Sequence, residues 1–296
     1  MDRRRFGNVF LIEGKNNGRF PFANTLLIDD GVRVLIDPAA GRSKMKAVLA
    51  EGVVDIIINS HYHEDHITYN YMFPDADIFF HEADRKGFGS FEGLFEMGVG
   101  KFLSPELKKI YIEMYSERFH FLGWEADRFL RGGEELVFGG TRVQVVHLPG
   151  HTPGHCGFFF PDIELMFSSD VDLTPFGPWY GDSSGDIDET IESTRKVGRI
   201  EAKWYVTSHD GPVYEDVGEL VEKYIKVVED REEVVYENIR EPATLEDLAR
   251  RWIVYRKPRS PEEMYLVGEK AMIAKHLERL IRRGLAVKEG EKYTAL

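Results

Sequence analysis

The sequence contains very little cysteine and glutamine. Cys156 is the only cysteine and Gln144 the only glutamine among 296 residues. One cysteine cannot form a disulfide within the chain, so a disulfide-based scaffold is excluded, and a reducing, intracellular setting is consistent with the composition. Charged residues make up 30% of the chain, and many charges combined with few thermolabile amides are typical of thermophile proteins.

Long hydrophobic runs are also missing. No stretch approaches the roughly 18 apolar residues of a membrane-spanning helix, and the run over residues 9–12 is too short for a signal peptide. We therefore expect a cytoplasmic protein without a membrane partner. The net charge of −13 argues against broad nucleic-acid binding by the whole chain. An apolar content of 43% is enough for one large α/β domain with a small appendage.

Spacing of apolar residues indicates the main elements. It predicts strands at residues 8–12, 24–28, 32–36, 55–60 and 203–208. It predicts helices at residues 43–51, 187–199, 214–239 and 268–283. The turn Asp29-Asp30-Gly31 is expected to join two of the strands as a hairpin.

Four potential metal ligands lie within six residues, His61-Tyr62-His63-Glu64-Asp65-His66, directly after a predicted strand. His61 and His63 alternate, so they point the same way from an extended backbone. Asp65 and His66 follow the bend and can turn toward a second position. Neutral imidazole and carboxylate oxygen both suit zinc. The loop is therefore predicted to serve two metal ions.

Matching side chains follow other apolar runs. His151 lies in Leu-Pro-Gly-His-Thr-Pro-Gly-His at residues 148–155, and Asp170 follows the run 165–169. His209 follows residues 204–208, with Asp210-Gly211-Pro212 behind it, and Asp37 follows Val-Leu-Ile. These strand ends supply the further ligands that the histidine loop requires.

In this order, the motifs over residues 7–212 resemble those of the metallo-β-lactamase-fold hydrolases. The resemblance implies an αβ/βα sandwich, with helices covering two mixed sheets and metals at one edge. It implies that one metal is bound by His61, His63 and His151, the other by Asp65, His66 and His209, and that Asp170 bridges them. It also implies that Asp37 braces the histidine loop instead of binding metal.

The same resemblance implies hydrolysis by a hydroxide that bridges two divalent ions. Asp65 would bind the second metal and could also orient this nucleophile. A histidine at position 63 favours zinc, although relatives with this motif also carry iron or manganese. Our first hypothesis is a small-molecule ester, thioester or lactone as substrate, as in the glyoxalase II-like branch.

Three alternatives stay open. One is a ribonuclease or phosphodiesterase similar to the β-lactamase-like protein 2 group, which also carries a C-terminal winged helix. Another is a mononuclear-iron sulfur dioxygenase, although such relatives use only a subset of the ligands found here. The third is a metal-loaded binding or regulatory module without catalysis, against which the complete ligand set argues.

Two segments are candidates for the pocket wall. Residues 85–130 hold ten aromatic side chains among charged residues and glycines, which predicts two or three short helices. They form either an ordinary helical layer or an overhang above the site. Residues 173–182 contain two prolines and two glycines, which predicts a stiff loop beside Asp170. Tyr180 in this loop is a candidate proton donor or oxyanion contact.

Glu241-Pro242 ends the long helix and opens a second unit, so we predict a catalytic domain at 1–240 and a winged-helix-like domain at 241–296. The second unit carries 12 Lys and Arg against 9 Asp and Glu. Lys275, Arg279 and Arg282 could share an exposed helix face that holds RNA. The favoured interpretation is a packing, lid or dimerisation module, as in a homo-oligomer.

Overall fold

In the computed structural model, residues 3–211 and 213–296 are described; Pro212 of the motif behind His209 lies outside them. A seven-stranded sheet has the order β1-β2-β3-β4-β5-β6-β7. Its strands are β1 (Arg4–Phe6), β2 (Val9–Ile12), β3 (Thr25–Asp29), β4 (Arg33–Ile36), β5 (Ile56–Ile58), β6 (Asp77–His81) and β7 (Arg128–Leu130). Strands β1 to β4 pair antiparallel, whereas β4 to β7 pair parallel.

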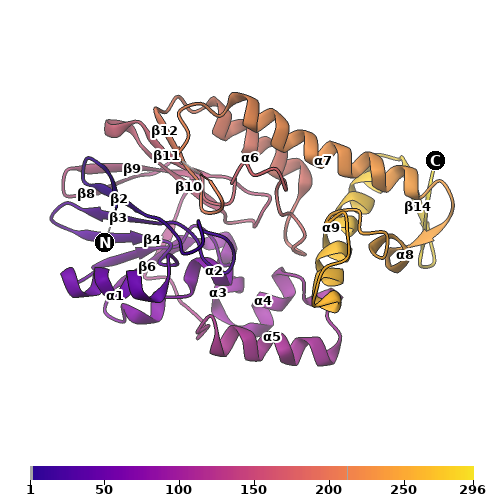
Figure 1. Ribbon diagram of the computed structural model, residues 1–296, viewed down its shortest axis with the longest axis horizontal. Helices are drawn as coiled ribbons and strands as arrows, with labels where there is room; N and C mark the ends of the chain where they lie inside the picture. The colour runs from indigo at the N-terminus through magenta and orange to yellow at the C-terminus, as the bar shows by residue number, and fades with distance from the viewer. Residues whose placement is uncertain (1–2, 212) are drawn as a thin grey trace.

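A five-stranded sheet faces the first one, with the order β12-β11-β10-β9-β8. Its strands are β8 (Glu135–Phe138), β9 (Thr141–His147), β10 (Cys156–Phe160), β11 (Leu165–Phe167) and β12 (Trp204–Val206). Only the β11–β12 pair is parallel among these strands. Figure 1 shows the two sheets side by side, with helices on both outer faces.

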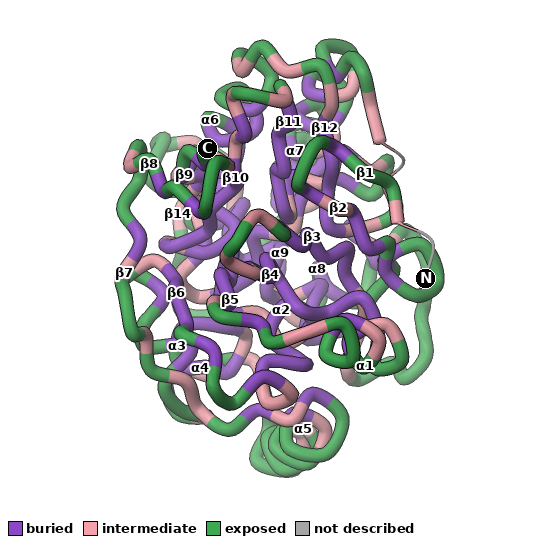
Figure 2. The backbone as a smooth tube through the Cα atoms, turned by 90° about the vertical axis from the view of Figure 1, so that its left-hand side faces the viewer, coloured by how far each residue is buried: buried purple, intermediate pink, exposed green. Residues whose placement is uncertain are grey.

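Alternation along the strands separates two apolar layers. Leu26 and Ile28 of β3 pack between the sheets, beside Phe158 of β10. Leu27 points the other way, toward Met45 of α1 (Arg42–Glu51). Successive strand residues point to opposite faces, so both faces of this sheet are buried. The resulting order of helix, sheet, sheet and helix confirms the expected α/β sandwich, and Figure 2 shows its buried strands at the centre.

Residues 85–130 form three short helices, as predicted. These are α3 (Arg85–Gly89), α4 (Phe91–Met97) and α5 (Pro105–Glu117), with a 3-10 turn, η3 (Gly100–Phe102), before α5. Ser90 and Ser104 cap α4 and α5 by accepting hydrogen bonds from backbone N–H groups three residues ahead. Tyr62 of the histidine loop is buried among Phe88, Phe119 and other side chains of this segment. The segment therefore packs directly against the metal loop.

The other outer layer contains α6 (Ile187–Arg199) and α7 (Gly218–Asn238). The predicted bounds of α6 are confirmed, and Asp186 caps the helix at the predicted start. The predicted helix at 214–239 is also found, but it begins four residues later, at Gly218.

Beyond α7, the chain forms β13 (Ala243–Thr244), α8 (Leu245–Ala249), α9 (Glu262–Arg282), β14 (Ala286–Glu289) and β15 (Lys292–Ala295). Thr244 and Asp247 form a capping box for α8, which confirms the predicted cap. The three strands make a small sheet in the order β13-β15-β14. Assignment of this unit to the winged-helix class stays a prediction.

Apolar packing continues across the predicted domain boundary at residue 240. Val221 and Val228 of α7 share one buried cluster with Leu148 of the larger unit and with Met272 and Leu277 of α9. The C-terminal segment thus rests on the second helical layer through a common core. Among the described residues, no helix is long and apolar enough to cross a membrane.

The prediction that Lys275 belongs to an exposed basic face of α9 is wrong. Only 7% of its side chain is exposed, and its ammonium group donates to the backbone oxygens of Ser183 and Gly185 at 2.8 Å. Arg279 forms ion pairs with Glu232 and Asp188. Arg282 is half-exposed and pairs with Asp186 and Asp188. The helix turns these cations toward the larger unit because acidic side chains and backbone carbonyls bind them there.

Candidate metal centre

All seven predicted ligands meet at one edge of the two sheets. The side chains that follow β5, β11 and β12 leave the carboxyl ends of these strands, where ligands bind in open α/β sheets. Two groups form there, each with its donor atoms within 4.8 Å of one another. The first group is His61, His63, His151 and Asp170, and the second is Asp65, His66 and His209.

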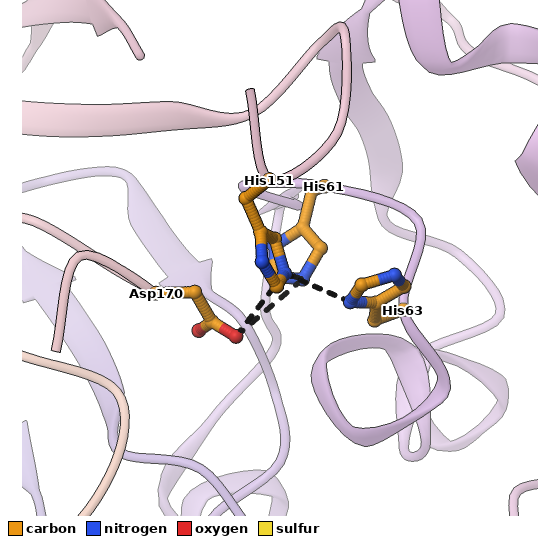
Figure 3. A group of neighbouring side chains, drawn as sticks. All are labelled: His61, His63, His151 and Asp170. Carbon is orange, nitrogen blue, oxygen red and sulfur yellow. Dashed lines mark hydrogen bonds and ion pairs between the residues drawn. The ribbon is translucent and has the colours of Figure 1, made fainter. Parts of the chain in front are cut away.

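Three ring nitrogens converge in the first group (Figure 3). His151 Nε2 lies 2.9 Å from His63 Nδ1 and 3.2 Å from His61 Nε2. Asp170 Oδ2 lies 3.3 Å from the same His151 nitrogen. Burial lowers the pKa of His61 well below its usual value, and burial with the neighbouring His63 lowers the pKa of His151 to about 4. Both rings are therefore neutral near pH 7, the form that binds metal.

Asp170 connects the two groups through its two oxygens. While Oδ2 faces His151, Oδ1 lies 3.0 Å from His66 Nε2 and 3.5 Å from His209 Nε2. Asp65 Oδ2 lies 3.4 Å from the same His209 nitrogen. Burial alone would lower the pKa of His209, but Asp170 and Asp65 raise it to about 10. The second group thus strongly favours a cation at its centre.

Two buried atoms in this centre, His66 Nε2 and Asp170 Oδ1, have no hydrogen-bond partner among the described residues. They lie 3.0 Å apart, but their geometry does not make a hydrogen bond. Unpaired buried polar atoms are rare in folded proteins and call for an explanation such as a bound ion. A nitrogen and an oxygen donor at this position fit a divalent metal ion, so the residues present suit the cofactor that the motif implies.

Asp37 braces the histidine loop, as expected. Its Oδ2 accepts hydrogen bonds from Ser60 Oγ at 2.6 Å and from His66 Nδ1 at 2.9 Å. Ser60 Oγ lies 2.9 Å from His61 Nδ1 and accepts a hydrogen bond from it. Both rings are thereby held with Nε2 facing the cluster, because Nδ1 carries the donated hydrogen.

The other three histidines are oriented by more distant segments. His151 Nδ1 lies 2.9 Å from the Trp179 carbonyl oxygen, and His209 Nδ1 lies 2.6 Å from that of Gly18. His63 is turned the other way, since its Nε2 lies 2.7 Å from Asp182 Oδ2 and its Nδ1 faces the cluster. Each imidazole therefore has one nitrogen held and one free for metal.

Asp182 is a functional residue that the sequence motifs do not mark. It accepts hydrogen bonds from Tyr62 and from Trp179 Nε1, the latter at 3.1 Å, in addition to its contact with His63. Burial alone would raise its pKa, but the contact with His63 lowers it. The sequence separation from His63 is 119 residues, and no local pattern identifies Asp182 as its partner.

Two further residues brace the centre without being predicted for it. His155 Nε2 accepts the backbone N–H of Asp170 at 3.1 Å, and its Nδ1 lies 3.0 Å from the Leu148 oxygen. Asp84 accepts hydrogen bonds from Thr152 Oγ1 and the Gly154 N–H, both at 2.7 Å. Burial raises the pKa of Asp84 to about 7. These contacts fix Asp170 and the loop that carries His151.

Tyr180 lies in the expected loop, but its hydroxyl points into the protein. It is completely buried, 2.7 Å from His276 Nε2 of α9 and 3.4 Å from an Arg231 nitrogen of α7. These contacts do not favour the predicted role as proton donor. The loop itself does line a small cavity, where Pro178 and Trp179 lie beside His151 and Asp170.

This sandwich with metal-ligand loops at one edge defines the class of the protein. Residues 18–209 match the family model of the metallo-beta-lactamase superfamily, more than half of the chain. The chain therefore belongs to the metallo-beta-lactamase superfamily, as the sequence motifs predicted.

Individual proteins with a similar structure share little sequence identity with this chain. A metallo-beta-lactamase family protein from Thermus thermophilus shares 22% identity and a TM-score of 0.74, over 98% of this chain and 99% of that chain. A beta-lactamase domain protein from Burkholderia ambifaria shares 17% identity and a TM-score of 0.74, over 100% of this chain and 94% of that chain. At these identities the likeness concerns the fold alone.

Among curated proteins, the hydroxyacylglutathione hydrolase of Brucella ovis is 27% identical over 118 residues. That alignment covers 40% of this chain and 34% of the Brucella protein. The chain thus matches about a third of the length of these curated relatives.

Proposed function

We propose that the protein is a dinuclear metal-dependent hydrolase. The observation that carries the proposal is Asp170, whose two oxygens face two separate histidine groups. Two divalent ions bound there would supply a nucleophilic hydroxide near neutral pH and polarise the oxygen that gains charge. The mixture of imidazole nitrogens and carboxylate oxygens suits zinc, and iron or manganese fits the same donors.

The roles of the protein groups follow from their positions. His61, His63 and His151 would hold one ion, and Asp65, His66 and His209 the other. Asp65 would also orient the nucleophile, since its carboxylate belongs to the second group, with Oδ2 3.4 Å from His209 Nε2. Asp37 and Asp182 keep the rings in place, so little rearrangement is needed when the metals bind.

For the substrate we propose a small-molecule ester, thioester or lactone with an apolar part. The similarity to a hydroxyacylglutathione hydrolase over 118 residues supports an acyl substrate. One exposed aromatic side chain also lies on a loop that contacts the centre. Phe20, two residues after the carbonyl that holds His209, is 59% exposed and lies 5.9 Å from the Phe119 ring. The exposed ring of Phe20, which packs on the buried ring of Phe119, can contact an acyl group.

The observed contacts weigh against the alternatives. A phosphodiesterase using the C-terminal helix would need free cations, but Lys275 is buried and Arg279 is paired with Glu232. A mononuclear-iron sulfur dioxygenase requires one group of ligands, whereas Asp65, His66 and His209 form a second one. A purely regulatory module gives no reason for two converging sets of ligands.

The test is turnover of the zinc-loaded protein on acyl thioesters, lactones, bis-p-nitrophenyl phosphate and single-stranded RNA. We expect thioester or lactone cleavage. His63→Ala or Asp170→Ala should reduce kcat/KM by at least about 1,000-fold, because each loses metal-based stabilisation of several kcal/mol. Far-UV circular dichroism checks that the variants fold. Cleavage of RNA or the phosphodiester alone would reverse the substrate proposal, and full activity of both variants would contradict the site.

A further inference from the structure

The segment of residues 176–186 supplies the groups that orient two of the three histidines in the first metal group. The Trp179 oxygen holds His151, and Asp182 holds His63. In the second group, His66 and His209 instead rely on Asp37 and Gly18, in the N-terminal part of the chain. Asp37 also supports His61 through Ser60, but only the first metal group depends on residues 176–186 as well.

Helix α9 contacts residues 176–186 through several side chains. Lys275 donates to the oxygens of Ser183 and Gly185, both at 2.8 Å. Four residues of α9 contact the segment in successive turns: Ala271, Met272, Lys275 and His276. A buried ammonium group is unfavourable unless its protons are hydrogen-bonded. The two carbonyls satisfy Lys275, so the amine and the segment fix one another.

Other elements complete the enclosure. Arg231 of α7 donates to the oxygens of Phe176 and Pro178, at 2.5 and 3.1 Å. On the opposite side, the N–H groups of Ser183 and Ser184 donate to the oxygens of Gly98 and Met97, at the end of α4. Figure 1 shows α9 lying between α7 above and the helices α4 and α5 below. The segment is thus held on three sides, and one of the three is the C-terminal unit.

We propose that α9 positions the first metal group, with Lys275 as the positioning residue that transmits its support to Asp182 and Trp179. This inference rests on the proposed metal centre and adds a function for the C-terminal unit. Without Lys275, residues 183–185 lose the anchor that α9 provides, and Asp182 holds His63 Nδ1 toward the metal less firmly. The second group keeps its own supports. The effect is therefore confined to one of the two ions.

The test compares Lys275→Met with Lys270→Met in the full chain. Both lysines belong to α9, but Lys270 pairs with Glu246 inside the C-terminal unit. Each protein is stripped with a chelator, reloaded with Zn²⁺ and analysed for metal per chain, and titration with a competing chelator gives both affinities. We expect wild type and Lys270→Met to retain two ions. Lys275→Met should bind one ion at least about tenfold more weakly, the effect typical of lost outer support.

Cobalt substitution identifies which ion is affected. The visible spectrum of Co²⁺-loaded Lys275→Met should approach that of His63→Ala, which lacks a ligand of the first group. Fewer than two ions in wild type would contradict the proposed dinuclear function. Two ions in wild type and unchanged affinities in Lys275→Met would overturn the inference while leaving that function intact.

Gly181→Ala provides a second variant that keeps the lysine. A Cβ atom at Gly181 would lie 3.1 Å from Ala271 Cβ and 2.9 Å from the Trp179 ring, so it should push the segment away from α9. We expect the same selective loss of one ion. If Lys275→Met fails to fold, as judged by circular dichroism, Gly181→Ala decides the question: retention of both ions at wild-type affinity would overturn the inference.

Discussion

Asp37 shows how a residue that binds no metal can control the metal centre. It is the first residue after β4 and adopts a left-handed conformation with φ of 50°. Its carboxylate accepts the Ser60 N–H and hydroxyl and the His66 ring N–H. Ser60 Oγ in turn accepts a hydrogen bond from His61 Nδ1. One buried carboxylate therefore sets the orientation of histidines in both metal groups.

We predict that Asp37→Ala lowers the affinity for metal by about 10- to 100-fold, because the rings of His61 and His66 lose their fixed orientation. Competition with a chelator measures the change. Asp30→Ala is the matched control: Asp30 accepts the Gly140 N–H and the Thr141 hydroxyl at the opposite end of β4. Equal metal affinities for Asp37→Ala and wild type would exclude the bracing role.

The ligands themselves could be predicted because each follows an apolar run and fits an ordered motif. The residues that hold these ligands in place could not be predicted from the sequence. Asp182 belongs to a loop that the sequence does mark as a pocket wall, but its partner His63 is fixed only by tertiary packing. The same packing turns Tyr180 inward, where His276 and Arg231 satisfy its hydroxyl. Alternation of loop residues does not reveal which side chain faces the site.

At the level of elements, the sequence predicted helix bounds correctly where the capping residue and the apolar periodicity agreed. Helix α6 begins at its Asp186 cap and keeps the predicted bounds. Helix α9 begins six residues before the predicted start at residue 268. Gly268 is an unfavourable residue inside a helix, but a Cβ atom there would lie 2.6 Å from the Tyr255 hydroxyl. Close packing against Tyr255 thus requires glycine, and a tertiary contact overrides the local propensity.

The packing of α7 on α9 involves Glu232, which lies at the centre of a charged cluster. It pairs with Arg279 and Arg283 at 2.6 Å, and His276 Nδ1 lies 3.7 Å away. Burial alone would raise the pKa of Glu232, but the contacts with His276 and Arg279 lower it to about 2. A carboxylate whose pKa is lower in the folded state stabilises the fold above its unfolded pKa.

We therefore predict that Glu232→Gln reduces the free energy of unfolding by about 2 kcal/mol at pH 7. The difference from wild type should persist down to about pH 4.5 and disappear as the pH falls toward 2, where the wild-type carboxylate also becomes protonated. Urea unfolding at several pH values measures this. Glu233→Gln, at the adjacent exposed position of α7, is the control. A pH-independent difference would contradict the electrostatic explanation.

For the whole molecule, the predicted boundary at residue 240 separates chain segments but not the core. Val228 of α7, Tyr180 of the site loop and Leu277 of α9 belong to one buried cluster. The sequence indicates a break at Glu241-Pro242, and a helix does end just before it. It does not indicate that α9 returns to pack on the larger unit, because the charge and periodicity of α9 also fit an independent module.

We predict that the metal-free protein unfolds in a single cooperative transition. The shared core means that removal of α9 would open a buried cluster that also contains Val228 and Val235 of α7, so neither unit can unfold without destabilising the other. Scanning calorimetry should give a calorimetric enthalpy equal to the van't Hoff enthalpy, with Tm shifted equally for both units by Glu232→Gln. Two separated transitions would instead show that residues 241–296 form an independent domain. Coupled unfolding would also explain why the C-terminal unit can support a metal site built largely from residues before 210. The C-terminal unit and the loop that carries Asp182 would then share a single free energy of unfolding.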